Sequence, residues 1–244
     1  MIDFHSHILP ALDDGAKSFD DTSALINELY TQRVTGIVCT PHFYPDSIGI
    51  DRFLSKRDLA LEQVRESFFL RKDIKFYSGA EVYLSEFLSL CKNLHPLCIE
   101  GTSILLLEMP FSPRWPSDYG KIIRRLVDYH SIIPMIAHAE RYPFVMKHSS
   151  GILKELIDSG CIIQANCDSF LDPQLREKVL KWLDNGLIHV LGTDCHSIGA
   201  RPPHMKQACD VISRELGPGV LENLESYSAG LLDNKKTRNN NLFF

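Results

Sequence analysis

Histidine, aspartate and glutamate side chains recur in this sequence directly after short runs of β-branched and aliphatic residues. In chain order they are His5 and His7, His42, Glu81, Glu108, His138 with Glu140, and Asp194 with His196. Asn166 closes one further run. Imidazoles and carboxylates serve as ligands of divalent metal ions and as general acids and bases. If the runs are strands whose ends meet, these side chains gather at one site.

The size of this set favours metal binding. His5 and His7 point to the same face of an extended segment, although such a pair alone also fits two partly exposed histidines. The full set of polar strand ends is much harder to obtain by chance, and so many acids and imidazoles cannot share a cleft without compensating cations. Mixed nitrogen and oxygen donors suit Mn²⁺, Fe²⁺ or Zn²⁺ better than Ca²⁺ or Mg²⁺. The number of ligands predicts a multinuclear site.

Seven apolar runs are predicted to be the strands that position these groups: Ile2–Phe4, Gly36–Thr40, Ile74–Ser78, Ser103–Leu107, Ile132–Ala137, Cys161–Ala165 and Ile188–Gly192. Most are continuously apolar, which is typical of parallel strands buried on both faces. Amphipathic stretches between them are predicted to be helices: Asp20–Arg33, Arg52–Arg71, Ser117–His130, Ile152–Ser159, Pro173–Asn185 and Pro203–Leu216. The alternation predicts an α/β fold, most simply a (β/α) barrel, whose strand ends converge on one mouth.

Local signals mark several helix ends. Ser18 and Asp172 are predicted N-caps, and Gly160 and Gly186 are predicted to end helices.

Composition excludes several other classes of protein. The chain has 244 residues, with 26 Lys and Arg against 31 Asp and Glu and a net charge of -5, so no basic footprint for nucleic acid is visible. No apolar run is long enough to span a membrane, and the first residues do not resemble a signal peptide. Seven cysteines without a Cys-x-x-Cys pair indicate reduced thiols in a cytoplasm rather than disulfides or a cysteine zinc site.

In combination and order, a group of short motifs resembles the PHP (polymerase and histidinol phosphatase) superfamily, and within it the CpsB/CapC type of bacterial tyrosine phosphatase. The motifs are Met1-Ile2-Asp3-Phe4-His5-Ser6-His7, Asp13-Asp14-Gly15, Thr40-Pro41-His42, Gly79-Ala80-Glu81, Ile136–Tyr142, Asp194-Cys195-His196 and Arg201-Pro202-Pro203-His204-Met205. The resemblance implies one PHP phosphatase domain over residues 1–232, built as a distorted (β/α)7 barrel. Residues 233–244 are polar and unpatterned, and we expect a disordered tail.

The resemblance also implies roles for single residues in a centre of three metal ions, expected to be Mn²⁺, with Fe²⁺, Zn²⁺, Co²⁺ or Mg²⁺ as substitutes. The implied ligand sets are His5, His7, Glu81 and Asp194; then Glu81, Glu108 and His138; then Asp14, His42 and His196. Arg141 and Arg201 are the implied catalytic and phosphate-binding residues, and His204 is a further candidate for contacting substrate. Glu108 replaces a histidine of other PHP branches, which fits the tyrosine-phosphatase branch.

The expected reaction is hydrolysis of phosphotyrosine by a metal-bridging hydroxide, without a phosphoenzyme. Metals neutralise the phosphate dianion and acidify a bound water, while arginine offers paired donors that match phosphate oxygens. The leaving phenolate, with a pKa of about 10, needs little protonation. The resemblance implies as partner the phosphotyrosine tail of a bacterial tyrosine kinase that controls capsule or exopolysaccharide synthesis, in the cytoplasm.

Three alternatives stay open at this point. Cys195 and Arg201 have the Cys-x5-Arg spacing of cysteine-dependent phosphatases, in which a thiolate attacks phosphorus. Another PHP phosphoesterase, such as a histidinol-phosphate phosphatase or a nuclease, would use the same ligands. A catalytically silent module would bind phosphotyrosine without turnover. Two aromatic loops, Phe43–Asp46 and Phe111–Pro116, either shape substrate choice or simply pack as turns.

Overall fold

The computed structural model describes residues 1–114, 118–148 and 150–233. The predicted disordered tail lies outside the described residues, apart from Asp233. The strands are β1 (Ile2–Ser6), β2 (Gly36–Cys39), β3 (His42–Phe43), β4 (Lys75–Ser78), β5 (Glu81–Tyr83), β6 (Ile104–Glu108), β7 (Ile133–Ile136), β8 (Ile162–Asn166) and β9 (Val190–Gly192). They pair in parallel, in the orders β1-β2-β4 and β3-β5-β6-β7-β8-β9.

The two sheets are parts of one ring. Thr40-Pro41 separates β2 from β3, and Gly79-Ala80 separates β4 from β5. β2 pairs with β4, and β3 pairs with β5. β2 and β3 therefore occupy one strand position of the ring, and β4 and β5 occupy the next. Pro41 has no N–H for a ladder, which favours the first break. Seven strand positions result, as predicted.

Contacts between β9 and β1 close the ring. The Asp194 amide donates to the His5 carbonyl at 2.7 Å, and the His7 amide donates to the Cys195 carbonyl at 3.0 Å. The buried Asp3 carboxylate accepts from the Thr193 amide at 2.8 Å and from its hydroxyl at 2.6 Å. A Cβ on Gly192 would lie 2.5 Å from the His5 Cβ, so only glycine permits this approach. The predicted distorted (β/α)7 barrel is confirmed.

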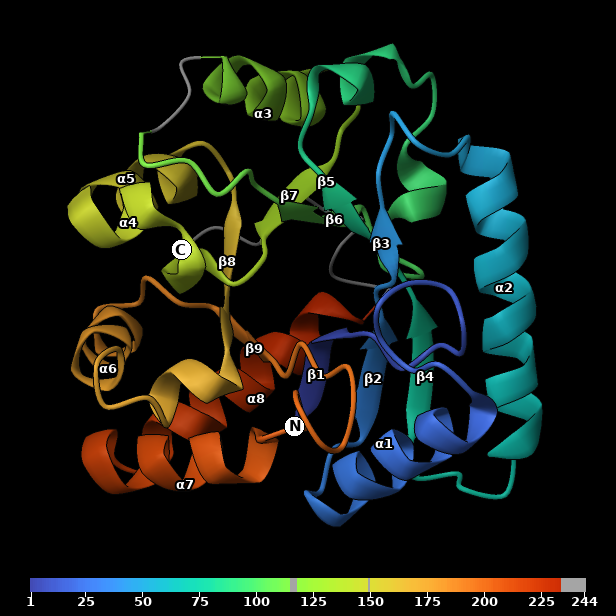
Figure 1. The fold of residues 1–244 in the computed structure, drawn as a ribbon. Coiled ribbons are helices and arrows are strands. Elements are labelled where there is room, and N and C mark those ends of the chain that lie inside the picture. The colour runs from blue at the N-terminus through green and yellow to red at the C-terminus, as the bar shows by residue number, and fades with distance from the viewer. Residues whose placement is uncertain (115–117, 149, 234–244) are drawn as a thin grey trace.

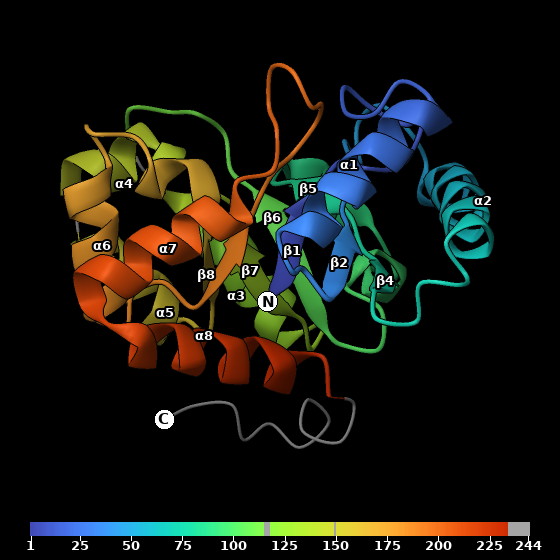
Figure 2. The same ribbon diagram turned by 90° about the horizontal axis from the view of Figure 1, so that it is seen from below.

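Helices surround the strands (Figure 1). They are α1 (Phe19–Thr31), α2 (Ile50–Ser67), α3 (Tyr119–Asp128), α4 (Pro143–His148), α5 (Ser150–Asp158), α6 (Arg176–Asp184), α7 (Met205–Leu216) and α8 (Pro218–Leu231). Figure 2 shows α8 across one end of the barrel, while the loop that leads to α7 projects from the opposite end. None of the described helices is both long and apolar enough to cross a membrane.

The barrel interior divides along its axis. The end that α8 covers holds apolar side chains, among them Phe4, Val38, Leu106 and Met135. Leu231 of α8 packs against them. Leu105 and Leu107 alternate with Ile104 and Leu106 along β6 and join the other core cluster, as the period of two in a strand requires. The polar residues lie at the other end of the barrel, at the carboxyl ends of the strands.

The predicted helix ends were partly correct. Ser18 caps α1 in a capping box with Asp21, and Gly160 and Gly186 adopt the left-handed conformation that favours glycine. The prediction that Asp172 caps a helix is wrong, because α6 begins only at Arg176. The sequence reasoning also missed α8, whose start at Gly217-Pro218-Gly219 resembles a loop.

Candidate active site

All nine predicted metal ligands meet at the carboxyl end of the barrel, opposite α8. Their donor atoms form overlapping groups within 4.8 Å: His7, Asp14, His42 and His196; His5, His7 and Glu81; His5, His138 and Asp194; and His42, Glu81 and Glu108. Most of these side chains are buried, whereas Asp14 is exposed. The grouping of Asp14, His42 and His196 matches one implied ligand set, to which the structure adds His7.

Glu81 lies at the centre of the buried part. Its Oε2 is 3.2 Å from Nε2 of both His5 and His7 and 2.9 Å from Nδ1 of His42. Its Oε1 is 2.9 Å from Nε2 of His138. Oε2 nevertheless has no hydrogen bond of acceptable geometry with the described residues. A buried carboxylate oxygen surrounded by ring nitrogens in this way fits the coordination of a cation.

The tautomer of His5 follows from Gln164. The His138 amide donates to Gln164 Oε1 at 2.7 Å, which identifies that atom as the oxygen. The same oxygen lies 3.2 Å from His5 Nδ1, so this ring nitrogen carries the hydrogen. The neutral His5 ring therefore turns the lone pair of Nε2 towards Glu81 and Asp194. Gln164 Nε2 donates to Asn166, whose Nδ2 donates to Asp194 Oδ2.

His7 and His196 are oriented in the same manner. The Asp13 carboxylate accepts from His7 Nδ1 at 2.7 Å, and the Asp194 carbonyl accepts from His196 Nδ1 at 2.8 Å. In its neutral form each ring presents an unprotonated Nε2, the arrangement that metal-binding histidines require. Gly15 makes the close loop possible, because a Cβ there would lie 2.2 Å from the His7 carbonyl oxygen.

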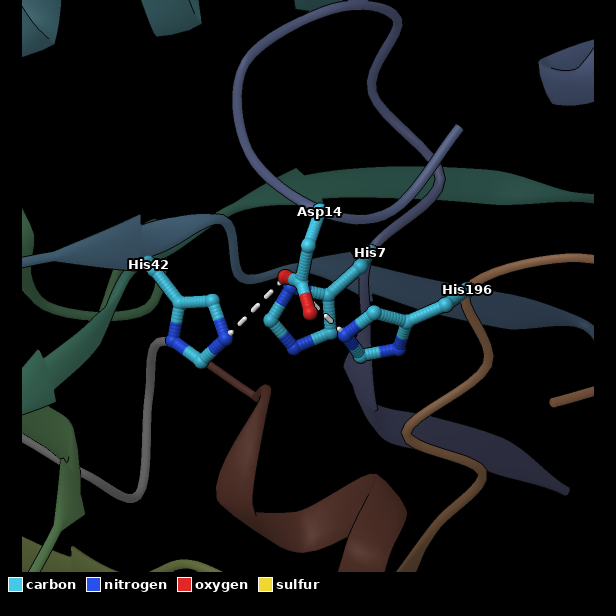
Figure 3. A group of neighbouring side chains, drawn as sticks. All are labelled: His7, Asp14, His42 and His196. Atoms are coloured by element: carbon cyan, nitrogen blue, oxygen red, sulfur yellow. Dashed lines mark ion pairs between the residues drawn. The ribbon is translucent and has the colours of Figure 1, made fainter. Parts of the chain in front are cut away.

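Asp14 completes the outer part of the cluster. Figure 3 shows its carboxylate reaching down from a loop between His42 and His196, beside His7. Asp14 Oδ1 is 3.4 Å from His42 Nε2 and 3.3 Å from His196 Nε2. One carboxylate and two imidazoles from three separate segments thus converge on one point.

The electrostatics also favour a cation. Burial, and then the charge of Glu81, raise the pKa of Glu108 to about 7. Burial opposes ionisation of Glu81, but the surrounding histidines hold its pKa well below the usual range. Burial would lower the pKa of His7, but Asp13, Asp194 and Glu81 raise it well above the usual value. A proton and a metal ion compete for the same lone pair, so carboxylates that attract one attract the other.

Two of the candidate ligands have unusual backbone conformations. His138 has φ 30° and Asp194 has φ 52°, in the left-handed region that non-glycine residues rarely adopt. Each lies two residues beyond the end of a strand, His138 after β7 and Asp194 after β9. Such strain persists only where the surroundings enforce it, which is typical of functional sites.

The two predicted phosphate-binding arginines lie together against Asp194. Arg141 Nη1 donates to Asp194 Oδ2 at 3.0 Å, and Arg201 Nη2 donates to the same oxygen at 2.6 Å. Arg201 Nη1 lies 2.8 Å from His196 Nε2. Both side chains are partly exposed and line a cleft of about 200 Å³. A guanidinium has five N–H donors, more than these contacts use, so both can also meet an anion.

The remaining residues to be placed are His204, Glu140 and Asp3. His204 Nε2 lies 3.8 Å from Oδ1 of Asp168, a residue that lines the arginine cleft. Contact between His204 and substrate stays a prediction. Glu140 is buried and accepts from the Asn166 amide, and burial raises its pKa to about 7. The Asp3 carboxylate accepts from the backbone amides of Thr193 and His5.

Aromatic side chains border the mouth. Tyr44 stacks on His42 with ring centroids 5.4 Å apart. Phe111 stacks on His138 at 6.0 Å, and the Arg141 guanidinium lies 5.3 Å from its centroid. Phe111 is half exposed. Both aromatic loops therefore reach the site, although Trp115 and Pro116 lie outside the described residues.

Cys195 is placed badly for nucleophilic attack. Its side chain is fully buried in the apolar core, and burial raises the pKa of its thiol well above the usual value. Arg201, its partner in the Cys-x5-Arg spacing, contacts Asp194 and His196 instead. A catalytic cysteine requires an accessible, acidified thiol, so the structure disfavours the thiolate alternative.

We expect Cys195→Ala to keep activity on a phosphotyrosyl peptide within about twofold, whereas loss of a true nucleophile costs about 10³-fold or more. Initial rates at equal metal content would measure this. Cys161→Ala, at another buried cysteine, is the matched control for lost packing. A large fall in kcat for Cys195→Ala alone, with an unchanged melting temperature, would revive the thiolate mechanism.

Comparison with known proteins agrees with this geometry. The family model described as capsular polysaccharide synthesis, CpsB/CapC, matches residues 1–232. The tyrosine-protein phosphatase CpsB of Streptococcus pneumoniae is 30% identical over 232 residues, covering 89% of this chain and 91% of that protein.

Two solved structures share the fold. One comes from work on YwqE from Bacillus subtilis and CpsB from Streptococcus pneumoniae, which are described there as metal-dependent tyrosine phosphatases. It superposes with a TM-score of 0.82 and 24% identity, covering 96% of this chain and 95% of that one. Histidinol phosphate phosphatase from Lactococcus lactis, complexed with zinc, L-histidinol and phosphate, gives a TM-score of 0.56 and 14% identity, covering 87% and 92%.

Proposed function

We propose a function on one premise: this chain belongs to the CpsB/CapC family of capsular polysaccharide synthesis proteins. The proposed activity is metal-dependent hydrolysis of phosphotyrosine in proteins. The observation that carries it is the convergence of five histidines and four carboxylates beside two partly exposed arginines. Acids and imidazoles supply the ligands, and the arginines supply donors for a dianionic phosphate.

The residues present fit a divalent metal centre. We propose that His5, His7, Glu81 and Asp194 hold one ion, that Glu81 also serves a second with Glu108 and His138, and that Asp14, His42 and His196 hold a third. The unbonded Oε2 of Glu81 and the fixed tautomers of His5, His7 and His196 support this assignment. Mn²⁺ suits these mixed donors. Bound divalent cations would supply Lewis acidity and an activated water.

The chain's own residues then orient the substrate. Arg141 and Arg201 bind the phosphate oxygens from the side of the site that faces the 200 Å³ cleft. Phe111, stacked on His138 beside Arg141, offers an aromatic face to the tyrosyl ring. The phenolate leaves with little protonation because its pKa is only about 10.

The proposed partner is the phosphotyrosine tail of a bacterial tyrosine kinase that controls capsule or exopolysaccharide synthesis, which would place the protein in the cytoplasm. The family description and the name of the pneumococcal relative support this role. The acidic balance of the chain, with net charge -5, offers no general attraction for nucleic acid.

Histidinol phosphate is the second candidate substrate, since a histidinol phosphate phosphatase shares the fold. We expect kcat/KM for a phosphotyrosyl peptide to exceed that for histidinol phosphate by at least about tenfold, because an alkyl leaving group is far more basic than a phenolate. Both rates would be measured on one preparation with the same metal content. Faster turnover of histidinol phosphate would contradict the proposal, and binding of the peptide without turnover would indicate a silent module.

A further inference from the structure

A second cleft, of about 340 Å³, adjoins the candidate metal centre and shares no lining residue with the arginine cleft. Its lining residues are Leu12, Asp13, Asp14, His42, Tyr44, Ile48, Phe53 and Lys56. Asp14 and His42 belong both to this cleft and to the outer cluster of Figure 3. The cleft is therefore continuous with the site where phosphate would bind.

Three of the side chains that line the cleft, Leu12, Ile48 and Phe53, are apolar, although charged residues line it as well. Leu12 comes from the loop after β1, Ile48 from the loop between β3 and α2, and Phe53 from the first turns of α2. Leu12 and Ile48 are only partly buried, although they pack against the core. Removing such exposed apolar surface from water is favourable, and this requires another apolar group to cover it.

Packing holds these walls in place. Phe53 is buried against Phe43, with ring centroids 4.9 Å apart. The Tyr44 ring lies between His42, at 5.4 Å, and Tyr83, at 5.7 Å. The volume lies at the lower end of the range of about 300–1,000 Å³ typical of ligand pockets. The cleft thus suits a single bulky side chain better than a long segment.

We propose that this cleft binds a bulky apolar side chain of the substrate peptide adjacent to the phosphotyrosine. The inference rests on the proposed phosphatase function and adds a specificity determinant to it. Arg141 and Arg201 line the other cleft, and Arg201 Nη1 lies 4.0 Å from Oδ2 of Asp14, which lines this one. A peptide whose phosphate reaches the arginines can therefore place a neighbouring residue in this cleft. The enzyme would then distinguish phosphotyrosine by its flanking residue as well as by its phosphate.

The test compares four substrates: free phosphotyrosine, a phosphotyrosyl peptide flanked by glycine, and two peptides with leucine directly before or directly after the phosphotyrosine. In the unaltered protein we expect one leucine peptide to have a KM about tenfold below that of the glycine peptide. Ile48→Ser should raise that KM to near the glycine value while leaving kcat, and the KM of the other substrates, within about twofold. Ile48→Trp, which fills the cleft, should act likewise if the serine variant folds poorly.

Leu59→Ser is the matched control, because Leu59 lies on α2, is 65% exposed and does not line the cleft. It should preserve the preference for leucine. Equal KM values for all peptides in the unaltered protein would overturn the inference, as would a preference that survives both Ile48 variants. A parallel rise in KM for free phosphotyrosine would show that the cleft holds the tyrosyl ring itself, which also overturns it. Failure to hydrolyse any of the four substrates would instead count against the phosphatase function.

Discussion

Removal of divalent metal with a chelator is expected to lower phosphotyrosyl-peptide hydrolysis by more than about 1,000-fold, and Mn²⁺ is expected to restore it. Metal ions contribute several kcal/mol to hydrolysis of this kind, and about 4 kcal/mol corresponds to a thousandfold rate. In this chain the loss should be severe because Glu81, Glu108 and Asp194 are buried close together. Without compensating cations their charges repel one another, and burial and the charge of Glu81 favour the protonated form of Glu108 by raising its pKa to about 7.

The measurement is the initial rate before chelation, after it, and after addition of Mn²⁺, with the metal content of each sample determined by mass spectrometry. Circular dichroism of the stripped protein is the control for folding. Activity that persists in folded protein with far less than one metal ion per chain would contradict the metal mechanism. Recovery with Zn²⁺ or Fe²⁺ but not with Mn²⁺ would contradict only the choice of ion.

The rule that polar residues follow strands predicted from sequence most of the side chains that gather at one end of the barrel. All seven predicted strand positions exist, so the residues at their ends had to converge in a parallel barrel. The breaks at Thr40-Pro41 and Gly79-Ala80 were not predicted, because local propensity does not show where a strand changes its partner. The missed α8 has a similar cause. Its stability comes from packing rather than from helix propensity: Leu231 packs against the apolar side chains inside the barrel, and Leu224 packs in the other core cluster.

The residues that orient the ligands were harder to identify. Gln164 offered one signal, a polar side chain inside the apolar run Cys161–Ala165, but its contacts with His5 and His138 depend on folding. Asp13 stood in a recognised motif, yet only the structure shows its carboxylate on His7. The pairing of Arg141 with Asp194 also joins distant parts of the chain, which one sequence cannot reveal.

Replacing Arg201 with alanine is expected to lower kcat/KM for a phosphotyrosyl peptide by about 100- to 1,000-fold while the protein keeps its metal. Loss of one donor that stabilises charge in a transition state typically costs about this factor. Arg201 approaches both Asp194 and His196, so its guanidinium borders two of the candidate ligand sets. We expect Arg141→Ala to lower kcat/KM as well, but by a smaller factor, because Arg141 contacts Asp194 alone among these ligands.

Arg201→Lys separates charge from geometry. Lysine keeps the charge but lacks the planar, paired donors of arginine, so we expect partial recovery of kcat/KM. Arg214→Ala is the matched control, since Arg214 is an exposed arginine of α7 that pairs with neighbouring Glu215. Unchanged kcat/KM in Arg201→Ala at full metal content would remove Arg201 from phosphate binding. Loss of metal together with activity would assign the guanidinium to holding Asp194 in place, because Arg201 Nη2 lies 2.6 Å from its Oδ2.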